Sequence, residues 1–377
     1  MRKTFQYRLF PTKSQRSALN KTLEYCRWVY NDTLAIRKDT YEQTGQSVSL
    51  YDTNKTLTLW KAEKPVLKSV YSQVLQNVQE RVDLAFQAFF RRVRNGETPG
   101  FPRFKGYGRY DSFTYKQSGF RVTGNRLFLS KIGDVKIKLH RPIEGQVKTL
   151  TIRRDRLGNW YASFSCVVKP KPLSPVDRVV GIDLGLTTFA TFSDEEKIER
   201  QRWFKQDEKD LKRVQRKVSR LPKGSAARRK AVLALNHVHQ RIAGRRLNFA
   251  HQQSRKLVDS YQIIVFEDLN IAQMSSAEKG KKAISKGIAD VAWGRFVQNT
   301  VAKAEEAGRT VVLVNPKNTT QACSGCGSIV PKTLSVRVHD CPHCGLKIDR
   351  DLNAAKNILA RGLASLRLSE PLEAHLL

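Results

Sequence analysis

Residues 179–192 have the sequence VVGIDLGLTTFATF, which predicts two strands joined by a tight turn at Gly185. The stretch is mostly apolar, and its one charged residue, Asp183, lies inside the first strand. A carboxylate within a buried strand costs free energy unless it is paired or binds a cation. Asp183 therefore marks this stretch as the start of a sheet and as the first candidate functional position.

Two further acids occupy comparable places downstream. Glu267 directly follows the apolar run 263–266, and Asp351 opens the last predicted helix, 351–366. Three carboxylates brought together repel one another, and Mg²⁺ relieves that repulsion because it prefers oxygen ligands. Two such ions about 3.5–4 Å apart activate a water molecule and stabilise the leaving oxygen of a phosphodiester. We therefore predict that Asp183, Glu267 and Asp351 form a catalytic site for two Mg²⁺ or Mn²⁺ ions.

Each acid also has a simpler interpretation. Asp183 can cap a turn, and Asp268 can take the place of Glu267 as the ligand. Asp349 or Asp351 can be a plain helix N-cap, since Asp is favoured at that position. The combination of three acids in a basic chain, and no single one of them, favours a metal nuclease.

The elements around these acids alternate between helix and strand. In order, they are a basic helical region at 205–258 with a break at 222–225, a strand at 262–266, a mobile loop at 275–287, a helix at 290–307 and a strand at 310–314. This order predicts an α/β fold with helices packed on a mixed sheet.

The N-terminal half has a different pattern. Residues 1–10 alternate as a strand does, and residues 13–96 have helical periodicity. Residues 119–169 indicate β-structure, including a hairpin with its turn at Gly158-Asn159. We predict a small antiparallel barrel with residues 1–10 as its outlying strand, and a domain border near residue 176, after a proline-rich segment.

Four of the six cysteines form two CxxC pairs that are separated by 14 residues and are each followed by glycine: Cys323 and Cys326, then Cys341 and Cys344. This spacing is typical of a zinc ribbon, in which four thiolates hold one structural Zn²⁺. His343 is an alternative ligand, and two redox-active pairs are an alternative interpretation. Only six residues, 345–350, separate the second pair from Asp351, so we expect the zinc module to brace or gate the catalytic site.

The charge of the chain indicates its partner. The net charge is +34, and residues 202–256 contain 17 Lys or Arg against three acids. A surface this basic needs an anion, and the commonest such anion is a nucleic-acid backbone. The sequence has no run of about 18 apolar residues and no signal-peptide pattern. We expect no membrane partner and a cytoplasmic prokaryotic protein that is associated with the nucleoid when active.

Together these motifs resemble the TnpB family, also called OrfB-type transposon proteins, which are relatives of type V CRISPR effectors. The resemblance covers nearly the whole chain. It is carried by GIDLG (181–185), FEDLN (266–270), NPKNTTQACSGCG (315–327), CPHCG (341–345), DRDLNAAKNI (349–358) and, less specifically, GFPRFK (100–105) and the N-terminal strand.

The resemblance implies a fold and a set of domains. The core is RNase H-like (RuvC), with an inserted zinc ribbon, a split β-barrel wedge and a helical recognition domain. The expected boundaries are 1–12 and 108–176 for the wedge, 13–107 for recognition, 177–318 and 349–367 for the RuvC core, 319–348 for the zinc finger that binds target nucleic acid, and 368–377 for a tail.

The implied activity is that of a transposon-encoded RNA-guided DNA endonuclease. It cleaves double-stranded DNA next to a short flanking motif, with a guide RNA from its own element and one protein monomer per RNA. Within DRDLN the family's catalytic acid is the second Asp, which selects Asp351. Two alternatives remain, a guide-independent transposase or resolvase and a nuclease-inactive RNA-guided repressor.

Several residues are candidates for nucleic-acid contacts. Side chains on a helix can read base edges or fix phosphates, and basic segments with aromatics can stack on bases. The aromatic residues of segment 101–116 can equally belong to a core. The candidates are Lys68, Tyr71, Ser72, Gln73, Gln76, Arg103, Lys105, His251, Ser254 and Arg255.

Overall fold

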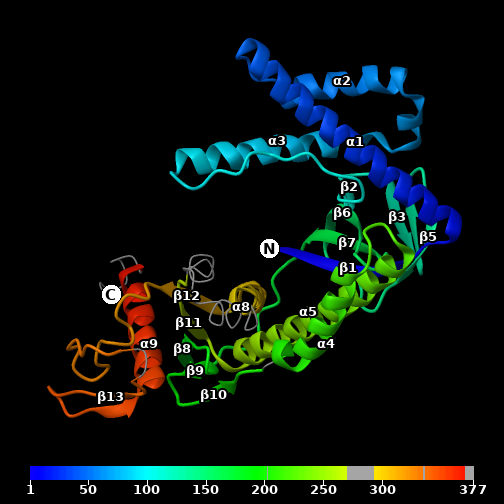
Figure 1. The fold of residues 1–377 in the computed structure, drawn as a ribbon. Helices are drawn as coiled ribbons and strands as arrows, with labels where there is room; N and C mark the ends of the chain where they lie inside the picture. The colour runs from blue at the N-terminus through cyan, green and yellow to red at the C-terminus, as the bar shows by residue number, and fades with distance from the viewer. Residues whose placement is uncertain (202, 270–292, 334–335, 370–377) are drawn as a thin grey trace. The chain divides into compact units, whose positions relative to one another are not determined.

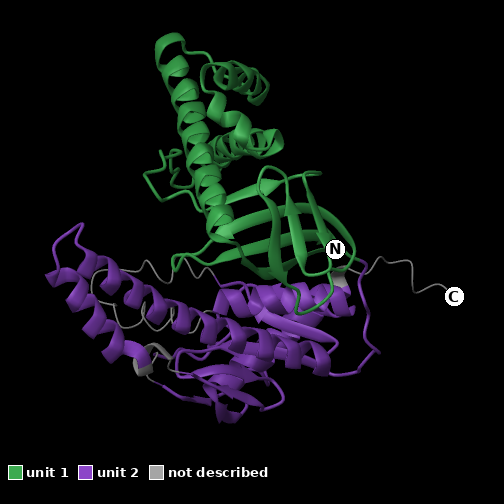
Figure 2. Ribbon diagram, turned by 90° about the vertical axis from the view of Figure 1, so that its right-hand side faces the viewer, with its two compact units in different colours: residues 1–168 green, residues 169–377 purple. Residues whose placement is uncertain are grey.

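The computed structural model describes residues 1–201, 203–269, 293–333 and 336–369. The chain forms two compact units, Met1–Val168 and Lys169–Leu377 (Figures 1 and 2). The loop predicted at 275–287 and residues 370–377 of the predicted tail lie outside the described residues. The predicted domain boundaries divide the chain more finely than these two units and stay predictions.

A curved antiparallel sheet of seven strands forms one layer of the first unit (Figure 2). Its order is β2-β6-β7-β1-β5-β4-β3. The strands are β1 (Arg2–Phe10), β2 (Ser112–Tyr115), β3 (Phe120–Thr123), β4 (Arg126–Leu129), β5 (Gly133–Lys138), β6 (Gln146–Arg154) and β7 (Trp160–Val167). The predicted hairpin at Gly158-Asn159 is confirmed, since β6 pairs with β7 across it. The prediction of an outlying first strand is wrong: β1 pairs with β7 and β5 because Phe5, Tyr7 and Leu9 are buried in the core.

The helices of the first unit lie within residues 13–96, for which helical periodicity was predicted. They are α1 (Lys13–Thr44), α2 (Leu50–Glu63), the 3₁₀ helix η1 (Pro65–Ser69) and α3 (Ser72–Arg94). Thr12 and Gln15 form a capping box that starts α1, in which each side chain accepts from the other residue's backbone N–H. Leu19 and Leu23 of α1 and Val78 of α3 are buried in one core with the sheet.

The second unit contains a mixed sheet of five strands in the order β10-β9-β8-β11-β12. The strands are β8 (Val179–Leu184), β9 (Thr188–Phe192), β10 (Lys197–Glu199), β11 (Ile263–Glu267) and β12 (Thr310–Val314). β9 is antiparallel to β8 and β10, whereas β11 runs parallel to β8 and β12. If the five strands are numbered 1 to 5 along the chain, their order in the sheet is 3-2-1-4-5, and only strand 2 runs in the opposite direction. This is the arrangement of an RNase H-like fold. The predicted α/β class is confirmed, and β10 is a strand that the sequence pattern did not predict.

Helices cover both faces of this sheet (Figure 1). The helices are α4 (Trp203–Arg220), α5 (Ala226–Ser260), α8 (Trp293–Ala307) and α9 (Arg350–Ser369). Val180, Ile182 and Phe266 pack against α5 and α8, whereas Val265 packs against Ile358 of α9. Because side chains alternate along a strand, Asp183 and Glu267 point to the α9 face. A small antiparallel hairpin, β13 (Val338–Asp340) and β14 (Lys347–Asp349), precedes α9. Among the described helices none is long and apolar enough to cross a membrane.

Candidate functional site

Asp183 and Glu267 lie at matching places on adjacent parallel strands. Ile182 of β8 is aligned with Phe266 of β11, and each acid is the next residue along its strand. Both side chains are half-buried on the α9 face. Asp268, the alternative to Glu267, is exposed, and its backbone N–H donates to the carbonyl of Val314 over 2.8 Å. The geometry thus favours Glu267 as the inward-facing acid.

The two acids of the DRD motif have separate structural roles. Asp349 accepts hydrogen bonds from the backbone N–H groups of Asp351 (2.9 Å) and Leu352 (3.1 Å), so Asp349 caps the N-terminus of α9. Asp351 lies in the first helical turn and is half-buried. The guanidinium of Arg350 lies 3.3 Å from its carboxylate. The N-cap interpretation therefore applies to Asp349 and leaves Asp351 for the site.

The electrostatics of the three acids indicate that they lie together. Burial first, and then the negative charges of Glu267 and Asp351, raise the pKa of Asp183 to about 8. Burial also raises the pKa of Glu267, whereas the hydrogen bond from the Thr319 hydroxyl and the positive charge of Arg361 lower it by less. The ionised form of Asp183 is therefore one that a nearby cation would stabilise.

The donor set fits a hard divalent cation. All three side chains offer carboxylate oxygens, which Mg²⁺ and Mn²⁺ prefer. The carboxylates are nevertheless less tightly gathered than the cysteines described next. In the described residues, only the four cysteines form a group of three or more His, Cys, Asp or Glu side chains whose ligand atoms lie within 4.8 Å of one another. Mutual repulsion of uncompensated charges is a sufficient physical reason for the wider spacing of the acids.

The four cysteines fit a tetrahedral zinc site. The sulfur of Cys323 lies 3.6 Å from that of Cys344, and the sulfur of Cys326 lies 3.7 Å from that of Cys341. A regular tetrahedron with Zn–S bonds of about 2.3 Å has edges of about 3.8 Å. A disulfide would require about 2.05 Å, so the arrangement favours metal over redox pairs. His343 is not part of the group.

The backbone around each cysteine pair is built in the same way. Gly327 donates its N–H to the carbonyl of Cys323, and Gly345 donates to Cys341, both over 2.9 Å. Both glycines have a positive φ (78° and 75°), a backbone conformation that residues other than glycine rarely adopt. Hydrogen bonds from Ser328 lower the pKa of the Cys326 thiol to about 6, which favours the thiolate that zinc requires.

Five of the candidates for nucleic-acid contacts lie in η1 or near the start of α3. Lys68, Ser72 and Gln76 are exposed. The hydroxyl of Tyr71 is 2.7 Å from that of Ser118, and the Tyr71 ring stacks on Tyr115. Lys61 donates to the hydroxyl of Ser72 over 2.8 Å. Gln73 accepts a long hydrogen bond of 3.4 Å from Ser118. The exposed members are thus available to a ligand, and Tyr71 has a packing role.

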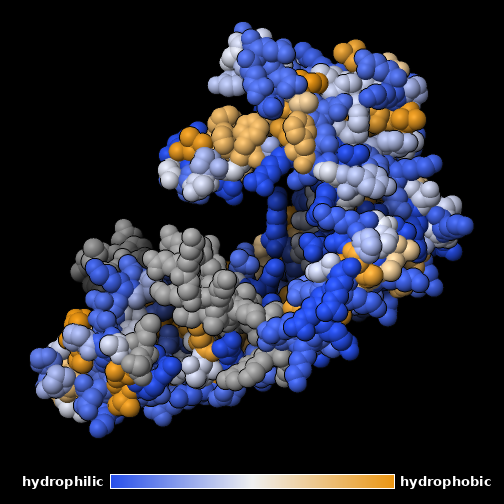
Figure 3. Space-filling view, in the orientation of Figure 1, coloured by the Kyte–Doolittle hydropathy of each residue, from blue (hydrophilic) through white to orange (hydrophobic). Residues whose placement is uncertain are grey.

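The basic-aromatic segment divides between core and surface. Tyr110 and Phe113 are buried, whereas Phe101, Phe104 and Tyr107 are exposed. Arg103 is exposed as well. Lys105 is half-buried, and the side chain of Asn31 fixes its backbone: Asn31 Oδ1 accepts from the Lys105 N–H over 2.7 Å. Apolar residues are also exposed along α3 (Figure 3).

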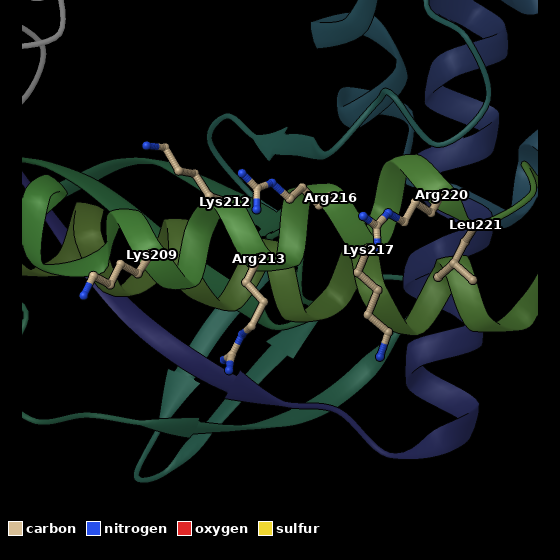
Figure 4. Close-up of a pocket in the computed structure, with 7 residues that line it drawn as sticks. All are labelled: Lys209, Lys212, Arg213, Arg216, Lys217, Arg220 and Leu221. Atoms are coloured by element: carbon tan, nitrogen blue, oxygen red, sulfur yellow. The ribbon is translucent and has the colours of Figure 1, made fainter.

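Two rows of cations line α4. Lys209, Arg213 and Lys217 form one row, and Lys212, Arg216 and Arg220 form the other, each at four-residue spacing (Figure 4). They border an open groove of about 730 Å³, and the surface over α4 and α5 is strongly hydrophilic (Figure 3). The buried carboxylate of Asp207 joins the two helices through Arg241 (2.6 Å) and Arg245 (2.9 Å). Glu208 and Asp210 pair with Lys212 and Arg213 of the rows (both 3.1 Å), and no acid partner of Lys209, Arg216, Lys217 or Arg220 is found among the described residues.

The three candidates on α5 differ in exposure. His251 is exposed, and Arg255, also exposed, pairs with Asp259. Ser254 is fully buried, and its hydroxyl is 2.8 Å from the ammonium of Lys303. A buried, occupied hydroxyl cannot meet a phosphate, so we do not retain Ser254 as a nucleic-acid contact.

Residues that the sequence analysis missed connect the zinc module to the core. Asn353 and Asn357 lie one turn apart on α9 and are buried. Both donate to the carbonyl of Ala322 over 2.7 Å, and the Asn353 side chain accepts from the N–H of Ser324 over 2.9 Å. Thr319 donates to the carboxylate of Glu267. The sequence contains a signal for Asn353 and Asn357: two asparagines at helical spacing inside an apolar helix face predict buried hydrogen bonds.

Three family profiles match the chain. A profile described as "Probable transposase" (OrfB_IS605) matches residues 163–278, a "Cas12f1-like, TNB domain" matches residues 293–358, and a "Helix-turn-helix domain" (HTH_OrfB_IS605) matches residues 1–46. In this chain the last stretch folds as β1 and one long helix, α1.

Curated relatives resemble the chain over its full length. A "Putative RNA-guided DNA endonuclease" of Streptomyces pristinaespiralis is 35% identical, covering 97% of this chain and 90% of the relative. "Putative RNA-guided DNA endonuclease InsQ" of Escherichia coli K12 is 30% identical, covering 97% and 94%. A solved structure of a Cas12f1–sgRNA–target DNA complex has a TM-score of 0.57 at 14% identity, over 92% of this chain and 82% of that chain, which shows a shared fold. The chain therefore belongs to the TnpB (OrfB-type) family of transposon-encoded proteins.

Proposed function

We propose that this protein is an RNA-guided DNA endonuclease that hydrolyses phosphodiester bonds at Asp183, Glu267 and Asp351. The observation that carries the proposal is the convergence of these acids from β8, β11 and α9 on one face of the sheet, where the charges of Glu267 and Asp351 act on Asp183. The activity is that of the curated relatives named above, to which the chain is related over 97% of its length.

Each acid would hold a divalent cation with its carboxylate oxygens. Two Mg²⁺ or Mn²⁺ ions bound there would supply a nucleophile and stabilise the leaving oxygen. Asp183, on which the charges of both other acids act, would hold the cations together with Glu267 and Asp351. Arg350, beside Asp351, offsets part of the negative charge around Asp183. The half-buried setting excludes some water and strengthens these interactions.

Zinc would have a structural role. The four thiolates fill a tetrahedron and leave no position for substrate. The hydrogen bonds of Asn353 and Asn357 fasten residues 319–324 to α9, the helix that carries Asp351. The module would thus brace the catalytic site, as its place in the sequence predicted.

The basic rows of α4 would bind the guide RNA or the RNA–DNA heteroduplex, because four of their six cations have no acid partner among the described residues and the rows border an open groove. Residues 1–12 and 108–176 would form the wedge barrel and residues 13–107 the recognition helices. Lys68, Gln73 and Gln76 would read a short motif beside the target. Residues 177–318 and 349–367 would form the RuvC core around the zinc insertion, 319–348. We expect one monomer per RNA, in the cytoplasm of a prokaryote.

A cleavage assay tests the proposal. The gene is expressed together with the flanking DNA of its element, the co-purifying RNA is sequenced, and plasmids that carry the matching target beside randomised flanks are incubated with the complex and Mg²⁺. We expect cutting of a subset of flanks, and none with Asp183→Ala. Cutting without RNA would indicate a guide-independent transposase or resolvase. Binding without cutting would indicate a repressor.

A further inference from the structure

Thr319 hydrogen-bonds directly to one of the three acids. Its Oγ1 donates to Oε1 of Glu267 over 2.5 Å and lies 3.1 Å from the carbonyl oxygen of Pro316. Thr319 is only 2% exposed, so water cannot readily replace its hydroxyl. Thr319 therefore fixes which way the Glu267 carboxylate points.

The chain path delivers Thr319 to this position. Val314, the last residue of β12, is aligned with Glu267 on β11. The chain then turns through Asn318, whose φ of 61° is in the left-handed region that Asn tolerates. Within five residues of leaving the sheet it has returned to the carboxylate at the neighbouring strand end.

Side chains from α9 hold this turn in place. Asn357 Nδ2 donates to the carbonyl oxygen of Thr319 over 2.8 Å. The guanidinium of Arg361, one turn further along, donates to the carbonyl oxygens of Asn315 (2.9 Å) and Lys317 (2.6 Å). The helix that carries Asp351 therefore also fixes the residue that orients Glu267.

We propose that Thr319 is a positioning residue of the nuclease centre, whose hydroxyl holds the Glu267 carboxylate in the orientation that binds a divalent cation. The inference rests on the proposed function of Glu267 as a ligand. Partners that orient a metal ligand commonly change metal affinity or activity 10- to 100-fold when they are removed. Thr319 itself touches neither the cation nor the DNA in this role.

The test compares Thr319→Val, which keeps the shape but removes the donor, with Thr319→Ser, which keeps the donor. Thr300→Val is the matched control, since Thr300 is a fully buried threonine of α8 whose hydroxyl donates to the carbonyl of Phe296. The readouts on the RNA complex are Mn²⁺ binding, from the loss of the free-ion EPR signal, target-DNA affinity, and the single-turnover cleavage rate at several Mg²⁺ concentrations.

We expect Thr319→Val to weaken Mn²⁺ binding and to slow cleavage by about 10- to 100-fold, with target affinity unchanged. Thr319→Ser and Thr300→Val should stay within about threefold of the wild type. Wild-type Mn²⁺ binding and cleavage in Thr319→Val would overturn the inference. Thr319→Ala removes the same hydroxyl and replaces Thr319→Val if that variant does not fold. Mn²⁺ binding is measured independently of cleavage. A wild-type protein that binds Mn²⁺ through Glu267 but cuts no DNA would contradict the proposed function. The role of Thr319 could then still be tested by its effect on Mn²⁺ binding.

Discussion

Gly181 of β8 lies directly beneath Ala355 of α9. A Cβ atom at Gly181 would come within 2.2 Å of the Ala355 carbonyl oxygen and within 2.5 Å of the Leu359 nitrogen. Only a residue without a side chain allows the helix backbone to approach the strand this closely. Asp351 lies one helical turn before Ala355, and Asp183 lies two residues after Gly181 on the same face. The close approach is therefore what brings the first and last acids together.

Gly181→Ala should separate α9 from the sheet. Because both opposing atoms belong to the backbone, the structure cannot yield by a rotamer change, and we expect a loss of about 1–3 kcal/mol or more in the free energy of unfolding. Cleavage should fall at least 100-fold. Thermal melting and the plasmid assay measure the two effects. Gly244→Ala in α5 is the control, since a Cβ there meets nothing within 4 Å and alanine favours a helix. A Gly181→Ala protein as stable and active as Gly244→Ala would contradict this packing argument.

Asp183→Asn should abolish cleavage and stabilise the metal-free protein. The pKa of Asp183 is raised to about 8, so the folded chain binds a proton that the unfolded chain releases above pH 4. Stability therefore falls as pH rises from about 4 to about 8, and the neutral amide removes that loss. We expect a gain on the order of 1–3 kcal/mol at pH 8 and little at pH 4.

The measurement is urea unfolding at the two pH values in buffer without divalent cations and without a chelator, which would also remove zinc. Asp268→Asn is the control, because Asp268 is the exposed neighbour of Glu267. It should retain cleavage and show no pH-dependent gain. Equal stability of Asp183→Asn and the wild type at pH 8 would show that Asp183 carries no such charge penalty.

Cys341→Ser should remove the zinc and with it most of the cleavage. Cys341 is buried and supplies one of four thiolates, and three remaining ligands bind zinc far more weakly. The zinc content measured by elemental analysis should fall from about one zinc per chain to near zero. Cys166→Ala replaces a buried cysteine of the first unit that is outside the cluster, so it should keep full zinc. Full activity in zinc-free Cys341→Ser would contradict the bracing role.

The triple change Arg216→Gln, Lys217→Gln and Arg220→Gln should weaken RNA binding. All three are exposed on α4, and no acid partner is found for them in the described part of the chain. Loss of up to three phosphate contacts should reduce the slope of log affinity against log salt by up to about 3. Filter binding at several KCl concentrations measures this slope. The charge-preserving set Arg216→Lys, Lys217→Arg and Arg220→Lys should behave as the wild type. An unchanged slope in the Gln variant would exclude this face of α4 as an RNA-binding surface.

Local patterns predicted most of the elements. The apolar run before Glu267 and the mostly apolar stretch around Asp183 predicted β11 and β8, because a strand's burial is visible in consecutive residues. The three-residue strand β10 was missed, since it is too short to have a period. The position of β1 in the middle of its sheet was also missed, because strand order depends on partners more than 120 residues away.

The sequence by itself determined the residue types on which the proposed chemistry depends: three acids at strand and helix ends, four cysteines at zinc spacing, and a charge of +34. These are properties of residue type and spacing along one chain. The tertiary structure decided which acid does what. Asp349 caps α9 while Asp351 enters the site, Glu267 faces α9 while Asp268 faces solvent, and Thr319 returns to Glu267 across 52 residues. Such assignments depend on which face a side chain occupies and on contacts between distant segments, and these exist only once the chain has packed.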